Sequence, residues 1–168
     1  MISGIISVDD YLAAQRLHTR HQLRRALAVL VVALLVGLVL VLSLPSAATV
    51  FGALLIGAAG GGLIGLGVTR AWILPRKVRR LHAQQATLRH VVTYAWNEAE
   101  IEVSWSGGQA RHPWADYVRC RENAQVLLLY HNDMLFELVP TSWFADAAQH
   151  EAFRRLASRV GASAARAV

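Results

Sequence analysis

The chain has 168 residues, of which 55% are hydrophobic, and its formal net charge is +6. This length leaves room for one small folded domain beside the long apolar stretches described below, and not for a second domain of ordinary size. The positive charge does not indicate nucleic-acid binding, because the basic residues gather beside those stretches. From residue 81 onward, eight Lys and Arg face nine Asp and Glu. The folded part is therefore close to neutral, and nucleic acid is not an expected partner.

Residues 1–25 form an arm ahead of the first apolar stretch. Residues 2–7 are β-prone, and Ser7 with Asp10 has the pattern of a capping box, with a hydroxyl at the N-cap and a carboxylate three residues later. We therefore expect a helix that starts after Ser7 and continues into the apolar stretch. An apolar stripe at spacings of three and four residues comprises Tyr11, Ala14, Leu17 and His21. This stripe predicts contact either with the folded domain or with a lipid surface.

Two stretches, residues 26–44 and 47–68, contain no charged residue. As helices they would be about 28 and 33 Å long, enough to cross a hydrocarbon core of about 30 Å. Basic residues flank both outer ends, so the positive-inside rule predicts a transmembrane hairpin with both termini in the cytoplasm. A cleaved signal peptide is the weaker alternative, because a second apolar stretch follows at once. The single cysteine, Cys120, agrees with a reducing compartment.

Small residues recur every four positions in the second apolar stretch, at Gly57, Gly61 and Gly65, and Gly37 lies in the first. Such spacing removes side-chain bulk from one helix face and lets another helix approach closely. We predict packing within the hairpin, with association between two copies of the chain as the alternative.

Residues 70–87 are expected to form a basic helical connector. Pro75 should end or bend the helix that leaves the second apolar stretch. An amphipathic ring and nearby cations are favoured at the level of lipid headgroups. The predicted headgroup residues are Trp72, Arg76, Lys77, Arg79 and Arg80.

From residue 88 to 161 the pattern changes to short alternating runs separated by turn residues, which predicts antiparallel β structure. Six strands are expected, at 89–96, 100–105, 110–114, 117–121, 126–131 and 134–139. A second capping box, Asp146 to Gln149, predicts a closing helix that Gly161 should end. Its apolar stripe comprises Phe153, Leu156 and Val160. Residues 162–168 are expected to be a flexible tail.

No catalytic, cofactor or metal site is predicted. His18 and His21 share a helix face, but two nitrogens do not make a zinc site. The other histidines are scattered along the chain, at positions 82, 90, 112, 131 and 150. Cys120 has no activating histidine nearby in sequence. The candidate partner-binding residues are Glu102, taken as a test of an exposed strand edge, and Trp143, at the junction between the last strand and the closing helix.

Several short motifs carry a resemblance to a known family. They are Asp9-Asp10-Tyr11, Leu74-Pro75-Arg76-Lys77, His112-Pro113-Trp114-Ala115-Asp116, Leu127-Leu128-Leu129-Tyr130, and Leu138-Val139-Pro140 ahead of Trp143-Phe144. The chain resembles the YcxB-like family of bacterial membrane proteins. That resemblance implies an α+β membrane protein, in which a two-helix transmembrane hairpin precedes a small domain similar to pleckstrin-homology (PH) folds, closed by a carboxy-terminal helix. The six expected strands are one fewer than the seven of a complete PH-like sheet.

These expectations lead to one main functional hypothesis, a non-enzymatic protein of the inner membrane that presents a PH-like domain to a protein partner or to a second copy of itself. Two alternatives stay open. The hairpin could protect against a membrane-acting toxin, or the basic connector could respond to anionic lipids.

Overall fold

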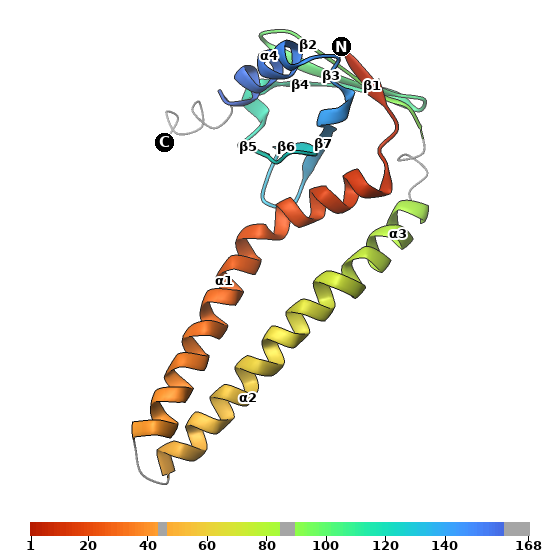
Figure 1. Ribbon diagram of the computed structural model, residues 1–168. Helices are drawn as coiled ribbons and strands as arrows, with labels where there is room; N and C mark the ends of the chain where they lie inside the picture. The colour runs from red at the N-terminus through yellow and green to blue at the C-terminus, as the bar shows by residue number, and fades with distance from the viewer. Residues whose placement is uncertain (44–46, 85–89, 160–168) are drawn as a thin grey trace. The chain divides into compact units, whose positions relative to one another are not determined.

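The computed structural model describes residues 1–43, 47–84 and 90–159 (Figure 1). The chain divides into two compact units. One, called here the β domain, combines Met1–Leu17 with Val78–Val168; the other, the helical hairpin, is His18–Lys77. The β domain therefore takes in residues from both sides of the hairpin. The predicted tail, 162–168, and Gly161 lie outside the described residues.

The first long helix, α1 (Val8–Ser43), starts where the capping box predicts. The backbone N–H of Asp10 donates to Ser7 Oγ at 3.0 Å, and the backbone N–H of Ser7 donates to Asp10 Oδ2 at 3.0 Å. Each side chain therefore satisfies a backbone donor that the helix itself leaves unpaired. The prediction of an unbroken helix from the arm into the first apolar stretch is confirmed.

The β domain contains seven strands in two antiparallel sheets. Sheet A has the order β1-β2-β3-β4, and sheet B has the order β5-β6-β7. The strands are β1 (Ile2–Gly4), β2 (Val92–Trp96), β3 (Glu100–Trp105), β4 (Gly108–Pro113), β5 (Arg119–Glu122), β6 (Val126–Tyr130) and β7 (Phe136–Pro140). All six predicted strands are present, and β1 adds the seventh because it pairs with β2, placing Ser3 opposite Thr93.

β6 is wholly buried: all of its residues have an exposed fraction of 0%. Leu127 and Leu129 join the core between the sheets, whereas Leu128 and Tyr130 join a second cluster on the opposite face. The first turns of α1 supply the cover for that second cluster, through Ala14 and Leu17 among others. Three residues of the predicted stripe, Tyr11, Ala14 and Leu17, thus pack on the β domain, which favours the first of the two alternatives, whereas His21 is exposed and lies in the other unit.

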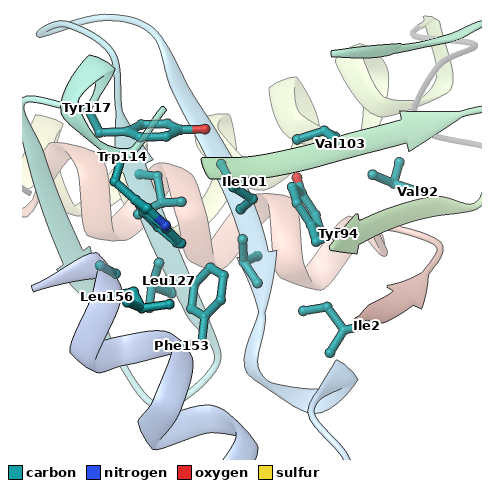
Figure 2. Close-up of a cluster of buried hydrophobic side chains, with 13 residues drawn as sticks. Ile2, Val92, Tyr94, Ile101, Val103, Trp114, Tyr117, Leu127, Phe153 and Leu156 are labelled. Atoms are coloured by element: carbon teal, nitrogen blue, oxygen red, sulfur yellow. The ribbon is translucent and has the colours of Figure 1, made fainter. Parts of the chain in front are cut away.

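The main core lies between the two sheets and α4 (Ala147–Ala157), as Figure 2 shows. Asp146 caps α4, because its Oδ1 accepts from the Gln149 N–H at 2.7 Å, which confirms the second capping box. Phe153 is fully buried and meets the edges of Trp96 and Trp114 at ring distances of 4.8 and 5.6 Å. α4 ends at Ala157, four residues before Gly161, and Val160 lies outside the described residues.

The helical hairpin is built from α1 and α2 (Ala47–Val68). A π-helical turn (Thr69–Ile73) joins α2 to α3 (Leu74–Gln84) without a break. Of the two expected effects of Pro75, an end of the helix is therefore wrong; the helix instead changes locally, through the π-helical turn. A proline lacks an N–H and its ring clashes with the carbonyl four residues earlier. The Leu74 N–H bonds to the Thr69 carbonyl, one residue further back than in an α-helix, and this wider turn accommodates Pro75.

Close packing in the hairpin uses one of the predicted glycines, Gly37, together with Gly52 and Gly62. A Cβ at Gly52 would lie 2.6 Å from the Gly37 carbonyl oxygen, and a Cβ at Gly62 would lie 2.7 Å from Leu30 Cδ2. A Cβ at Gly57, Gly61 or Gly65 would meet nothing within 4 Å. Gly37 is thus at a close approach, whereas packing of the other three predicted glycines within the hairpin is wrong. Their face is turned away from α1.

Replacing Phe153 with Ala is expected to lower the free energy of unfolding of the β domain by about 3–5 kcal/mol, because it leaves a cavity in the main core. The measurement is the midpoint of thermal unfolding of the purified full-length chain in detergent. Glu151→Ala, an exposed change on the same helix, serves as the matched control. Equal midpoints for the two variants would contradict the packing of α4 described here.

Gly52→Ala is expected to destabilise the hairpin, because its methyl group would be forced against the Gly37 carbonyl. Gly57→Ala should be neutral or stabilising, because alanine is favoured over glycine in a helix interior by about 0.5–1 kcal/mol. The two variants are compared by thermal unfolding in detergent, monitored through the loss of the helical circular dichroism signal. The account fails if Gly57→Ala is the more damaging change.

Candidate binding cleft

A cleft of about 680 Å³ opens between the two sheets of the β domain. Apolar side chains form most of its wall, and polar groups converge at one part of it. The lining residues are Ile6, Val92, Tyr94, Val103, Trp105, Ala110, His112, His131, Leu135, Phe136 and Glu137. Pockets that bind small molecules or anchor side chains combine an apolar wall with a few placed polar groups.

The alternation of the strands explains why these side chains face inward. In the register of β3 and β4, Ile101 lies opposite His112 and Val103 lies opposite Ala110. Ile101 and Val103 are buried in the core, so their partners on β4 point to the same side of the sheet. Gln109 alternates with Ala110 and is exposed on the other face.

The polar part of the cleft is a cluster of two histidines and one carboxylate. Glu137 Oε1 lies 3.1 Å from His131 Nε2 and 3.6 Å from His112 Nε2. The imidazole rings of the two histidines are 4.9 Å apart. The expectation that the histidines are scattered is therefore wrong for this pair, which the two sheets bring together from positions far apart in the sequence.

Two buried tyrosines adjoin this cluster. The Tyr94 hydroxyl donates to the Leu138 carbonyl at 3.1 Å. Burial, with a further contribution from the charge of Glu137, raises the pKa of both Tyr94 and Tyr117 far above the ordinary phenol value. Both phenols stay neutral across the physiological pH range.

β4 and β7 border the cleft, and they are the terminal strands of their sheets among the described residues. At the rim, the β6–β7 turn holds out two apolar side chains, Met134 and Leu135, with exposed fractions of 82% and 58%. Asn132 fixes this turn, because its Oδ1 accepts from the N–H groups of both residues at 2.8 Å. Apolar side chains are thus displayed beside two strand edges.

Glu102 does not lie on a strand edge. It is on β3, which is hydrogen-bonded to β2 on one side and β4 on the other. Its carboxylate pairs across the strands with Arg111, at 3.4 Å between Oε2 and Nε. The edge prediction for Glu102 is wrong, and a role in partner binding stays a prediction.

Trp143 is half-buried rather than exposed. Its indole packs against both hydrophobic clusters and lies 6.1 Å from the ring of Tyr94. A Cβ at Gly4 would collide with this indole, so the close approach of β1 to Trp143 requires glycine at this position. Trp143 therefore supports the docking of the arm, and its role in partner binding stays untested.

The predicted headgroup residues are all exposed along the continuous helix that contains the π-helical turn and α3. The Arg76 guanidinium lies over the Trp72 ring, 5.0 Å from its centroid. The set comprises Trp72, Arg76, Lys77, Arg79 and Arg80. Contact with lipid stays a prediction for these side chains.

Cys120 is a half-buried residue of β5, and burial raises the pKa of its thiol to about 12. A thiol in this state is a poor nucleophile at neutral pH.

Fold and cleft define an α+β chain that joins two helices, each long and apolar enough to cross a membrane, to a two-sheet domain with a cleft between its sheets. Residues 96–157 match the family model described as YcxB-like protein. The matched segment runs from the last residue of β2 to the last residue of α4 and confirms the resemblance there. No curated protein and no solved structure matches the chain.

The His112, His131 and Glu137 cluster is what sequence reasoning missed. Part of the signal was present, because His131 and Glu137 flank a turn and alternation along β6 and β7 places them on one face. The proximity of His112 to His131 and Glu137 depends on how sheet A packs on sheet B, and no local sequence pattern encodes this packing.

Native Cys120 is expected to react with a thiol reagent at pH 7.5 at least about tenfold more slowly than after unfolding, because its raised pKa keeps the thiolate rare. Since the folded pKa exceeds the unfolded one, the stability contribution of the neutral thiol is full below about pH 8.5 and is lost as the pH rises toward 12. Reaction rates in detergent with and without denaturant test this. Equal rates would contradict it.

Proposed function

We propose that this chain is a non-enzymatic, membrane-anchored interaction module. The helical hairpin anchors it in a bacterial inner membrane, and the β domain presents its cleft to an extended segment of a protein partner on the cytoplasmic side. The apolar cleft between the terminal strands β4 and β7 is the observation that carries this proposal.

The surface of the two long helices supports membrane anchoring. Only 6% and 11% of the residues in their most apolar 18-residue windows are buried, a much smaller share than in the core helices of water-soluble folds, which supports anchoring. Large side chains stand out from them, among them Val29 and Leu42 on α1 and Phe51 and Ile64 on α2, with exposed fractions from 67% to 75%. Lipid is the environment in which such surfaces are stable.

The strand pairing of the arm supports the topology. β1 precedes the first apolar stretch and β2 follows the second, yet the two strands pair along Ile2–Gly4. A chain that crosses twice returns to the side from which it started, so both segments can fold together. The basic residues beside the outer ends of the hairpin favour the cytoplasm as that side.

The architecture of the β domain supports the PH-like assignment. Four strands in one sheet, three in a second, and a helix after the last strand are the parts that the family resemblance implies. PH-like domains bind partners through surfaces of a fixed scaffold, and the half-buried Cys120 with its raised pKa offers no activated nucleophile.

The partner that suits the cleft is an extended peptide with apolar side chains. A strand added to the free edge of β4 or β7 would form backbone hydrogen bonds, and its alternate side chains would enter the apolar cleft beside Val103 and Phe136. Met134 and Leu135 at the rim would add apolar contact. The hairpin leaves the glycine face of α2 open, and such a face lets another helix approach closely. Association with a second copy of the chain is therefore tested in the same experiment.

Ala110→Trp is expected to fill the cleft and prevent partner binding, because Ala110 lines it from β4. Gln109→Trp adds the same indole to the other face of the same strand and is the matched control. A photo-crosslinking amino acid at Met134 reports occupancy in native membranes, with captured segments identified by mass spectrometry. Capture should survive Gln109→Trp and fall at least about tenfold with Ala110→Trp, as for a filled hot-spot pocket.

Capture at Met134 that is unchanged by Ala110→Trp would contradict the cleft as the binding site. If only a second copy of the chain is captured, through the hairpin and regardless of either substitution, the chain self-associates and the proposal of a separate partner is wrong.

A further inference from the structure

The cluster of His112, His131 and Glu137 has the composition of a metal site. All three candidate ligand atoms lie within 4.8 Å of one another, and two imidazole nitrogens with one carboxylate oxygen form a ligand set found in zinc proteins. The residues come from three separate backbone segments, namely β4, the turn directly after β6, and β7. A bound ion would therefore connect sheet A to sheet B.

The backbone around the cluster is fixed. His112 is held in the β3–β4 ladder opposite Ile101, and Glu137 in the β6–β7 ladder opposite Leu129. The His131 N–H donates to the Leu135 carbonyl at 3.0 Å, which closes the turn between His131 and Glu137. The ring of Tyr117 packs on His131 at 4.4 Å and on His112 at 6.2 Å. The donors are thus presented by a rigid frame.

Two of the three donor separations are close to those found around a small ion. Two ligands at 2.0–2.1 Å from zinc, related by the tetrahedral angle, lie about 3.3–3.4 Å apart. Glu137 Oε1 is 3.1 Å from one imidazole nitrogen and 3.6 Å from the other. Shifts of a few tenths of an ångström would bring both of these pairs to the separation that zinc imposes. The ligand nitrogens of the two histidines lie within 4.8 Å of each other and would have to be at the same separation in the bound state.

Hydrogen bonding alone leaves the cluster incompletely satisfied. Only the His131 contact is short enough for a hydrogen bond, since 3.6 Å from His112 exceeds that range. Glu137 Oε2 and the Tyr117 hydroxyl are buried, and neither makes a hydrogen bond of good geometry among the described residues, although the Tyr117 hydroxyl lies close enough to interact with the Glu137 carboxylate. A cation would engage both histidines and balance the carboxylate in one step.

We propose that His112, His131 and Glu137 bind a zinc ion that clamps the two sheets at the polar part of the cleft. The cleft is open beside all three side chains, so the fourth zinc ligand would be water or an acidic group of a bound molecule. Two imidazole donors and one carboxylate donor favour zinc over magnesium or calcium, which prefer oxygen ligands and higher coordination numbers. The site does not depend on the proposed partner, because the chain supplies all three ligands.

The test uses the full-length chain in detergent, purified with a tag that contains no histidine and stripped with a chelator. Zinc chloride is then titrated by calorimetry, and the midpoint of thermal unfolding is measured with and without zinc. The expected result is one zinc ion per chain and a higher midpoint with zinc, because binding to the folded state alone stabilises it. Cobalt should give the visible absorption of tetrahedral coordination.

Glu137→Gln keeps the shape of the side chain and His112→Ala removes a ligand from the other sheet. Each should weaken zinc binding at least about tenfold, by analogy with the 10–100-fold losses that even outer-shell changes cause. His150→Ala is the matched control, because His150 Nε2 also faces a carboxylate oxygen, that of Glu122 at 3.1 Å, without a second histidine. His18→Ala with His21→Ala controls for the histidine pair on α1.

The proposal is overturned if wild-type chain and Glu137→Gln bind zinc equally, if zinc leaves the unfolding midpoint unchanged, or if only the α1 pair accounts for the binding. Circular dichroism confirms that each variant is folded, so loss of binding cannot arise from loss of structure. Partner capture at Met134 is measured separately, and failure there leaves the zinc result intact.

Discussion

The complete burial of β6 is the constraint on which the β domain depends. Val126–Tyr130 is apolar on both faces, so a single sheet with one wet side cannot hold it. One face needs sheet A and α4, and the other needs Ala14 and Leu17 from the first turns of α1. The domain is therefore complete only when residues from before and after the hairpin fold together.

Further contacts join the same two parts of the chain. β1 pairs with β2, and Trp143 packs beside Gly4 where no side chain would fit. His82 Nε2 lies 2.8 Å from the Ile6 carbonyl; because a carbonyl can only accept, that nitrogen carries the proton. The β domain is built from residues before and after the two long apolar helices. This ties the anchoring proposal to the binding proposal, since Ile6 of the arm also lines the cleft.

Most helices and strands could be predicted from short sequence patterns, whereas the helix contacts, the strand order and the cleft depend on long-range packing. Capping boxes at Ser7 and Asp146 and the alternation of the strands act within a few residues, so the sequence revealed them. The predicted packing of Gly57 against α1 is wrong, because the spacing of glycines shows which of them share a helix face but not which face contacts α1. The predicted edge position of Glu102 is wrong, because the order of strands in a sheet is not encoded locally. The cleft with His112 and His131 forms only when the two sheets pack together.

Disulfide trapping between Ser3 and Thr93 tests most directly whether the arm and the later strands form one domain. Both are changed to cysteine in a Cys120→Ser chain, and the disulfide is formed by an oxidant in isolated native membranes. Paired residues of neighbouring strands lie within bridging distance, whereas Ser104, the next partner of Thr93, is about 10 Å from Ser3. We predict fast closure for Ser3 with Thr93 and little for Ser3 with Ser104. Equal closure of both pairs, or none of either, would contradict the account.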